Sequence, residues 1–217
     1  MITLYGNEFS SPSNKVRYVA NALGIEYEYK HVDLMGGANK TESYLKLNPS
    51  GKVPVIQDGD FTLFESNAII RYLARKVSSS LYPQDLKRGA LVDQWMDFAS
   101  LHVAQAVGRV FFNRVAYKFL NAEVDPRSLS DGLQFLQRFL PVLEGALAKS
   151  AFLAGPELSL ADFSLLAGLD QAEVAGIELE VYPALSQWRK ELIAKDFYQK
   201  CFSSYAAMLH ALTQKAS

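Results

Sequence analysis

NPSGKVPVIQDGDFTLFESNAIIRYLARK, the sequence of residues 48–76, predicts two short strands followed at once by a helix. The strands are expected at residues 53–56 and 61–64, on either side of Asp58-Gly59, a dipeptide typical of a tight hairpin turn. Apolar residues then recur at the spacing of one helix face. A polar pair, Glu65-Ser66, stands where the second strand gives way to the helix. This position suggests that the pair has a function outside the apolar core.

The residues before this stretch alternate strand and helix signals. Residues 2–5 form a short apolar run, and residues 25–29 alternate apolar with charged side chains, so both are expected to be strands. Helices are expected over residues 13–23 and 41–47. Together with the hairpin and the helix that follows it, these elements have the order βαβαββα.

The predicted helix at residues 13–23 has one apolar side, formed by Val16, Val19, Ala20 and Leu23. Asn14, Lys15 and Asn21 lie elsewhere on this helix. Gly24 follows it as a stop signal.

The remainder of the chain shows only helical periodicity, which indicates a second domain. Helical segments are expected at residues 90–121, 129–149, 160–174, 185–192 and 204–213. The polar segment Ser78-Ser79-Ser80 and the residues after it have no periodicity. We therefore predict an α+β protein with a βαβαββα domain at residues 1–78, a linker at 79–87 and an all-α helical bundle at 88–217.

Composition excludes several classes of function. The 217 residues are 49% apolar and 21% charged, with a net charge of -1, so no basic excess is present to bind nucleic acid. No apolar run reaches the roughly 18 to 20 residues of a membrane span, and the amino terminus does not resemble a signal peptide. The single cysteine and three widely spaced histidines predict neither a disulfide framework nor a metal site. A cytoplasmic location fits best.

A serine-rich segment joins the first strand to the first helix. Pro12 suits a first helical position, which would make Ser11 the N-cap of the helix. The simplest interpretation is that these serines only cap the helix. That interpretation leaves Ser10 without a structural role. Ser10 follows the carboxyl end of a strand, where open α/β sheets bind their ligands, and it lies beside a helix N-terminus, where negative charge is favoured.

Glu65-Ser66 occupies a similar position at the start of another helix. Its carboxylate has a structural explanation, as a favourable partner of the helix dipole. Two polar helix starts in one small domain nevertheless suggest a shared ligand. Val53-Pro54 adds to this suggestion, because a proline at a strand start forfeits a ladder hydrogen bond, and a cis bond there would leave the Val53 backbone free to pair with a peptide-like ligand.

These residues resemble the glutathione transferase family over nearly the whole chain. Residues 48–54 and 65–69 are similar to the glutathione-binding signature of that family, in the same order and spacing. In the second domain, Ser159-Leu160-Ala161-Asp162 resembles the family's capping box, and residues 182–188 resemble the segment that follows it. The position of Ser10 after the first strand resembles the serine-type theta, phi and zeta classes. The run from Ser10 to Arg17 looks most like the zeta class, although Pro12 stands where that class has a cysteine.

The resemblance implies a thioredoxin-like first domain that binds glutathione and a helical second domain that supplies the pocket for an electrophile. By position, Ser10 corresponds to the catalytic serine of the family. Ser10 is a better candidate for this role than Ser11, and both serines are better candidates than Tyr5. The glutathione-binding residues would be Ser11, Lys40, Lys52, Val53, Glu65 and Ser66. Among these, Glu65 and Ser66 would hold the γ-glutamyl group, and the Val53 backbone would pair with the cysteinyl unit. Lys52 and Lys40 would meet the glycyl carboxylate.

Two functions remain open on the sequence alone. The first is a glutathione transferase that uses glutathione as co-substrate against small hydrophobic electrophiles, with glutathione peroxidase activity as a further expectation and no metal or second cofactor. The alternative is a non-catalytic binding or scaffold module, because residues 48–69 also resemble the amino-terminal part of the gamma subunit of translation elongation factor one. The presence of Ser10 favours the enzyme. The family resemblance also implies a homodimer.

Overall fold

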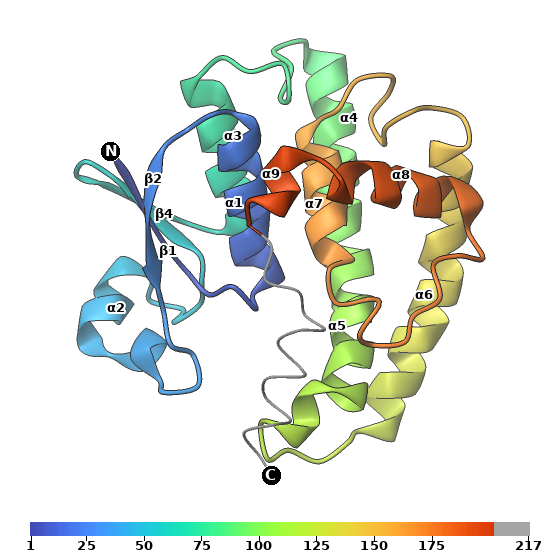
Figure 1. Cartoon of the computed structure of the whole chain (residues 1–217), viewed down its shortest axis with the longest axis horizontal. Coiled ribbons are helices and arrows are strands. Elements are labelled where there is room, and N and C mark those ends of the chain that lie inside the picture. Colours follow the sequence, from blue (N-terminus) through green and yellow to red (C-terminus); the bar gives the residue numbers. More distant parts are fainter. Residues whose placement is uncertain (202–217) are drawn as a thin grey trace. The chain divides into compact units, whose positions relative to one another are not determined.

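A computed structural model describes residues 1–201 of the chain, which form two compact units (Figure 1). The first unit comprises Met1–Tyr82 together with the described residues from Lys195 onward, and the second comprises Pro83–Ala194. A four-stranded sheet belongs to the first unit, and the second is built of helices. The predicted α+β class is therefore confirmed. The helix expected at residues 204–213 lies outside the described residues.

The sheet of the first unit has the strand order β2-β1-β3-β4. These strands are β1 (Ile2–Gly6), β2 (Tyr27–His31), β3 (Val55–Asp58) and β4 (Phe61–Phe64). β1 is parallel to β2 and antiparallel to β3, and β3 is antiparallel to β4. The carboxyl ends of β1, β2 and β4 therefore meet at one edge of the sheet, which we call the ligand edge because the sequence predicts that a ligand binds there.

Four α-helices and a short 3-10 turn complete the first unit. They are α1 (Ser11–Ala22), the turn Ala38–Lys40, α2 (Glu42–Leu47), α3 (Ser66–Lys76) and α9 (Asp196–Gln199). α1 and α3 pack against each other on one face of the sheet, and α2 lies on the other face (Figure 1). The predicted order βαβαββα is confirmed, whereas α9 was not predicted because a single turn of helix has no periodicity to detect.

Each face of the sheet buries its own apolar cluster. On the helical face, side chains of β1, β3, α1 and α3 surround one small internal space; they include Leu4, Val16, Ile56 and Leu73. On the α2 face, Val32, Tyr44 and Val55 are buried together, and Tyr5 packs against them. The Tyr5 hydroxyl donates to Gln57 Oε1 over 2.6 Å. The Tyr5 side chain therefore has structural contacts on the α2 face of the sheet.

The second unit is a bundle of helices in the described residues. It contains α4 (Leu86–Asp97), a π-helical segment (Phe98–Val103), α5 (Ala104–Arg114), a 3-10 turn (Ala116–Lys118), α6 (Pro126–Leu147), α7 (Leu160–Gly168) and α8 (Pro183–Ile193). Every residue of α7 is buried, so this helix forms the centre of the bundle. α7 ends earlier than predicted, since the chain after Gly168 continues in turns.

The capping box at the start of α7 is present as predicted. Asp162 Oδ2 accepts hydrogen bonds from the backbone nitrogen and the hydroxyl of Ser159, each over 3.0 Å. Asp162 Oδ1 accepts from the Leu153 nitrogen at 3.0 Å and from Trp188 Nε1 at 3.1 Å. Burial raises the pKa of this carboxyl group, although all four donors favour its charged form. Asp162 thus joins three separate segments of the bundle.

Candidate functional site

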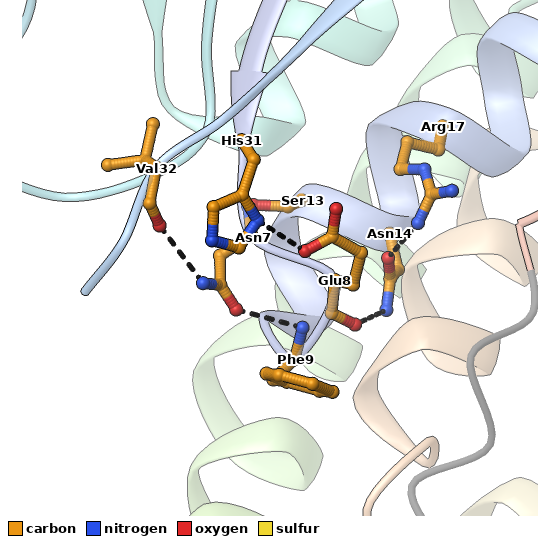
Figure 2. Close-up of polar contacts among 8 residues, drawn as sticks. All are labelled: Asn7, Glu8, Phe9, Ser13, Asn14, Arg17, His31 and Val32. Atoms are coloured by element: carbon orange, nitrogen blue, oxygen red, sulfur yellow. Dashed lines mark hydrogen bonds and ion pairs between the residues drawn. The ribbon is translucent and has the colours of Figure 1, made fainter. Parts of the chain in front are cut away.

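The loop between β1 and α1 is held by buried polar side chains (Figure 2). Asn7 is buried; its Nδ2 donates to the Val32 carbonyl over 3.0 Å, and its Oδ1 accepts from the Phe9 nitrogen over 2.9 Å. Asn14 Nδ2 donates to the Glu8 carbonyl over 2.8 Å, and His31 Nδ1 lies 2.7 Å from Glu8 Oε2 (Figure 2). These bonds fix the backbone that leads to Ser10.

Ser10 is the N-cap of α1. Its backbone is extended, with φ −98° and ψ 108°, and its Oγ accepts a hydrogen bond from the Ser13 nitrogen over 3.4 Å. The prediction that Ser11 is the cap is therefore wrong: Ser11 is the first helical residue and Pro12 follows it. Proline is tolerated at either position, because the N–H groups of the first turn have no partner within the helix. As an acceptor, Ser10 Oγ keeps its own hydrogen available for donation.

Lys15 connects the start of α1 to the start of α3. Its Nζ lies 2.8 Å from Asn67 Oδ1 and 3.2 Å from Ser66 Oγ. The sequence placed Asn14 and Lys15 away from the apolar side of the helix, but both are buried in the structure. The polar side of α1 contacts α3 and the loop that precedes α1. The apolar periodicity of α1 alone does not reveal these contacts.

Glu65 precedes α3 with an unusual backbone conformation. Its φ of 71° and ψ of 108° lie in a region that residues other than glycine rarely adopt, at a cost of order 1–3 kcal/mol. The Glu65 side chain is exposed and makes no cap hydrogen bond to the helix. Ser66 is the first residue of α3 and is half-buried. This strained conformation turns a carboxylate toward solvent beside a helix N-terminus.

The Val53–Pro54 peptide bond is cis, as suggested by the sequence. β3 begins at Val55 rather than at Val53, since Pro54 has no N–H group with which to join the ladder. The backbone of Val53 makes no hydrogen bond to any other residue in the described part of the chain. Because Tyr5 pairs with Val55 and Val55 pairs with Phe64, Val53 lies at the ligand edge.

The residues before Val53 are held in place by hydrogen bonds from the side chains of Asn48 and Tyr44. The Lys52 carbonyl accepts from Asn48 Nδ2 over 2.7 Å and from the Tyr44 hydroxyl over 3.0 Å. Burial raises the pKa of Tyr44 to about 12, so this hydroxyl is a donor at physiological pH. The Lys52 side chain itself is exposed.

Lys40 ends the 3-10 turn and is also exposed. The neighbouring residue, Asn39, donates from Nδ2 to the Gly51 carbonyl over 2.7 Å. The segments that carry Lys40 and Lys52 are therefore tied together through the residue next to each lysine. The contacts place the predicted binding residues around the ligand edge: Ser10, Ser11, Val53, Glu65 and Ser66 lie on it, and Lys40 and Lys52 lie on the loops that lead to it.

The electrostatics of the ligand edge centre on Lys15. Burial and, to a smaller extent, the nearby Arg71 guanidinium lower the pKa of Lys15, the Glu65 carboxylate opposes both effects, and the net pKa is about 8. Sequence reasoning did not propose Lys15, Asn7 or Asn48 as residues that shape the site. Their positions could have indicated such a role, because all three are polar residues beside a predicted helix start or a signature motif.

The described residues contain no group of three or more His, Cys, Asp or Glu side chains arranged to hold a metal ion. Within the same residues, no helix combines the length and apolar character needed to cross a membrane.

Known proteins match the chain along nearly its whole length. Family models described as "Glutathione S-transferase, N-terminal domain" and "Glutathione S-transferase, C-terminal domain" match residues 1–75 and 128–196. The chain is 34% identical over 205 residues to "Probable glutathione S-transferase GSTF2" of Oryza sativa subsp. japonica, covering 92% of this chain and 95% of that protein. It is 35% identical over 207 residues to "Glutathione S-transferase theta-1" of Homo sapiens, covering 92% and 86%.

A solved structure of glutathione S-transferase-I bound with the ligand lactoylglutathione has the same fold, with a TM-score of 0.84 and 30% sequence identity. The match covers 92% of this chain and 97% of that chain.

Proposed function

The chain belongs to the glutathione S-transferase family, and on this premise we propose that it binds glutathione along the ligand edge and that Ser10 activates the thiol. The chain is an enzyme of that family, because relatives at about 35% identity over most of its length are glutathione S-transferases. In the proposed reaction the Ser10 hydroxyl donates to the glutathione sulfur, the thiol proton passes to solvent, and the thiolate forms a bond to an electrophilic carbon of a small hydrophobic molecule while the bond from that carbon to its leaving group breaks.

One observation supports this site above the others: the starts of α1 and α3 lie side by side at the ligand edge, with the unpaired Val53 backbone at the same edge. Lys15 Nζ lies 3.2 Å from Ser66 Oγ, and Lys15 stands only one helical turn beyond Ser11. Two helix N-termini and an unpaired strand-like backbone suit a ligand that is both anionic and peptide-like. Glutathione is such a molecule.

The required chemistry is modest. A free thiol has a pKa near ~8.5, so only a few per cent is ionised at pH 7, and the thiolate is the nucleophile. Lowering that pKa by about two units requires roughly 2.7 kcal/mol of stabilisation of the charged form. A hydrogen bond to a charged group supplies about 1.5 to 3 kcal/mol, and the dipole of α1 adds a fraction of that. The Ser10 hydroxyl and the start of α1 are therefore sufficient.

The tripeptide is proposed to extend from α3 to the loop before β3. The Glu65 carboxylate accepts from the γ-glutamyl ammonium group, and Ser66 donates to the γ-glutamyl carboxylate. The Val53 backbone pairs with the cysteinyl unit. Lys52 and Lys40 meet the glycyl carboxylate, and Ser11 lies close to the sulfur.

We propose peroxidase activity as a second reaction, in which the same thiolate takes the outer oxygen of an organic hydroperoxide and releases the alcohol, and a second glutathione then reduces the oxidised sulfur to give glutathione disulfide and water. The alternative of a non-catalytic scaffold has no support among the relatives described above, which are named as transferases. We further propose a cytoplasmic homodimer in which the helical domain, predicted at residues 88–217, supplies the electrophile pocket. Size-exclusion chromatography with light scattering tests the dimer, and a monomer at micromolar concentration contradicts it.

Calorimetric titration with glutathione, followed by a conjugation assay with a chloronitroaromatic electrophile, tests the function. We expect saturable heat at millimolar glutathione or below and conjugation above the uncatalysed rate. If millimolar glutathione produces no saturable heat, the chain has the architecture of the family without the proposed function.

A further inference from the structure

Lys15 is the buried cation of the ligand edge, and the proposed reaction assigns it no role. It lies on α1 with 5% of its surface exposed. A lysine ammonium group donates hydrogen bonds and accepts none. Two atoms of α3, Ser66 Oγ at 3.2 Å and Asn67 Oδ1 at 2.8 Å, therefore accept from it.

The direction of the bond to Ser66 matters for a ligand. When Ser66 Oγ accepts from the charged Lys15, the hydrogen of the Ser66 hydroxyl points elsewhere and remains available for an anion at the start of α3. A neutral lysine amine has a lone pair and can accept that hydrogen instead. Loss of the Lys15 charge therefore removes a positive charge from the site and also competes for the hydroxyl hydrogen that the ligand would use.

We propose that Lys15 is a positioning residue of the glutathione site, and that binding of the tripeptide is coupled to protonation of its side chain. This inference rests on the proposed function, because it assumes that the γ-glutamyl carboxylate lies at the start of α3. Lys15 acts through Ser66 and through its charge, without touching the reacting sulfur.

The groups around Lys15 strengthen the coupling between ligand binding and protonation of its side chain. Burial and the Arg71 guanidinium disfavour its charged form, Glu65 favours it, and the balance gives a pKa of about 8. Asp196 and Tyr198 are the titratable groups of α9, the other helix that packs against α1. The ligand carboxylate at Ser66, which Lys15 itself contacts, adds negative charge near Lys15 and so favours its protonated form, and the ammonium group at Glu65 partly opposes this effect. By linkage, the protonated form then binds the ligand more tightly.

A purely structural role is the competing explanation, in which Lys15 only fastens α1 to α3. The two roles differ in their dependence on pH. An arginine retains the charge and the donors at every accessible pH, whereas a lysine loses its charge. Lys15→Arg therefore keeps the positive charge but cannot lose its proton in the accessible pH range, whereas Lys15→Met removes the charge and the titrating group together.

The test is calorimetric titration of the intact wild-type protein, Lys15→Arg and Lys15→Met with S-methylglutathione, whose blocked sulfur cannot ionise. Titrations at pH 7, 8 and 9 in two buffers of different ionisation enthalpy give the number of protons taken up on binding. At pH 8 we expect the wild type to take up about half a proton more than Lys15→Arg. We expect the affinity of the wild type to fall relative to that of Lys15→Arg as the pH rises to 9, and Lys15→Met to bind at least tenfold more weakly at pH 7.

Equal proton uptake and equal pH dependence in the wild type and Lys15→Arg would overturn the inference while leaving the proposed function intact. Unchanged affinity in Lys15→Met would do the same. Absence of binding by the wild type would instead overturn the proposed function, and the inference with it. Because the wild type and Lys15→Arg suffice for the comparison of proton uptake, a folding defect in Lys15→Met does not affect that part of the test.

Discussion

Asn48 Nδ2 donates a hydrogen bond to the Lys52 carbonyl oxygen over 2.7 Å, from a side chain that is itself buried. This bond holds the peptide group next to Val53, whose backbone is proposed to pair with the cysteinyl unit of glutathione.

Asn48→Ala is expected to raise KM for glutathione several-fold and to leave kcat nearly unchanged. The Lys52 carbonyl keeps its bond from Tyr44 and loses the one from Asn48, and Ser50 loses its bonds to Asn48 Oδ1, at a cost of about 1 to 2 kcal/mol in stability. Initial rates at varied glutathione and fixed electrophile measure both constants. A fall in kcat with unchanged KM would show that the loop does not position the tripeptide.

Ser10→Ala is expected to lower kcat at least tenfold while glutathione still binds, because the hydrogen bond to the sulfur is lost. The same change removes the N-cap of α1, at a cost of about 1 kcal/mol in stability. Ser10→Gly separates these effects, since glycine at a cap costs only a few tenths of a kcal/mol relative to serine. We expect Ser10→Gly to keep a near wild-type melting temperature and to lose turnover like Ser10→Ala.

Ser11→Ala is the matched control for Ser10. Ser11 begins the helix and does not cap it, so its replacement should affect turnover less than that of Ser10. If Ser11→Ala abolishes turnover while Ser10→Ala does not, the sulfur lies beside Ser11.

The lowered pKa of Lys15 predicts the pH dependence of stability. In the unfolded chain this lysine has its ordinary pKa of 10.5, whereas in the folded protein its pKa is about 8. Between these values the unfolded state binds more protons, so the contribution of Lys15 to the free energy of unfolding rises with pH. The slope reaches at most about 1.4 kcal/mol per pH unit.

Urea denaturation of the wild type and Lys15→Met between pH 7.5 and 9.5 measures this contribution. We expect the stability of the wild type to increase relative to that of the variant as the pH rises. A constant difference would mean that Lys15 does not titrate in this window.

Asp162→Asn is expected to destabilise the helical unit by about 2 to 4 kcal/mol. The Asp162 carboxylate accepts four hydrogen bonds, from the Ser159 nitrogen and hydroxyl, the Leu153 nitrogen and Trp188 Nε1. An asparagine directs an NH₂ group at two of these donors. Thermal unfolding measures the loss, and Glu157→Gln, an exposed change in the same loop, is the control.

The sequence predicted the fold where local pattern determines it. Asp58-Gly59 fixed the hairpin, and the change from alternating signals to helical periodicity fixed the α+β class. The N-cap of α1 was harder to predict than the fold. Ser10 and Ser11 have the same chemistry, and only the observed backbone at Ser10 identifies it as the cap. Long-range burial could not be predicted either: the partners of Lys15 lie 51 and 52 residues away, and nothing near Lys15 indicates them.

Among the proposed binding residues, Glu65, Ser66 and Val53 are predicted from motif and position. The structure adds what a motif does not contain, namely the left-handed backbone of Glu65 and the support of the Lys52 carbonyl by Tyr44 and Asn48. These features depend on segments that meet only after the chain has folded.

The most direct test of the central claim is the pKa of the glutathione thiol when it is bound, measured from thiolate ultraviolet absorbance as a function of pH. With wild-type protein we expect this pKa to fall to roughly 6.5, about two units below the free thiol. With Ser10→Gly we expect it to return to near ~8.5 while glutathione stays bound. An equally low pKa in both proteins would contradict the claim that Ser10 stabilises the thiolate.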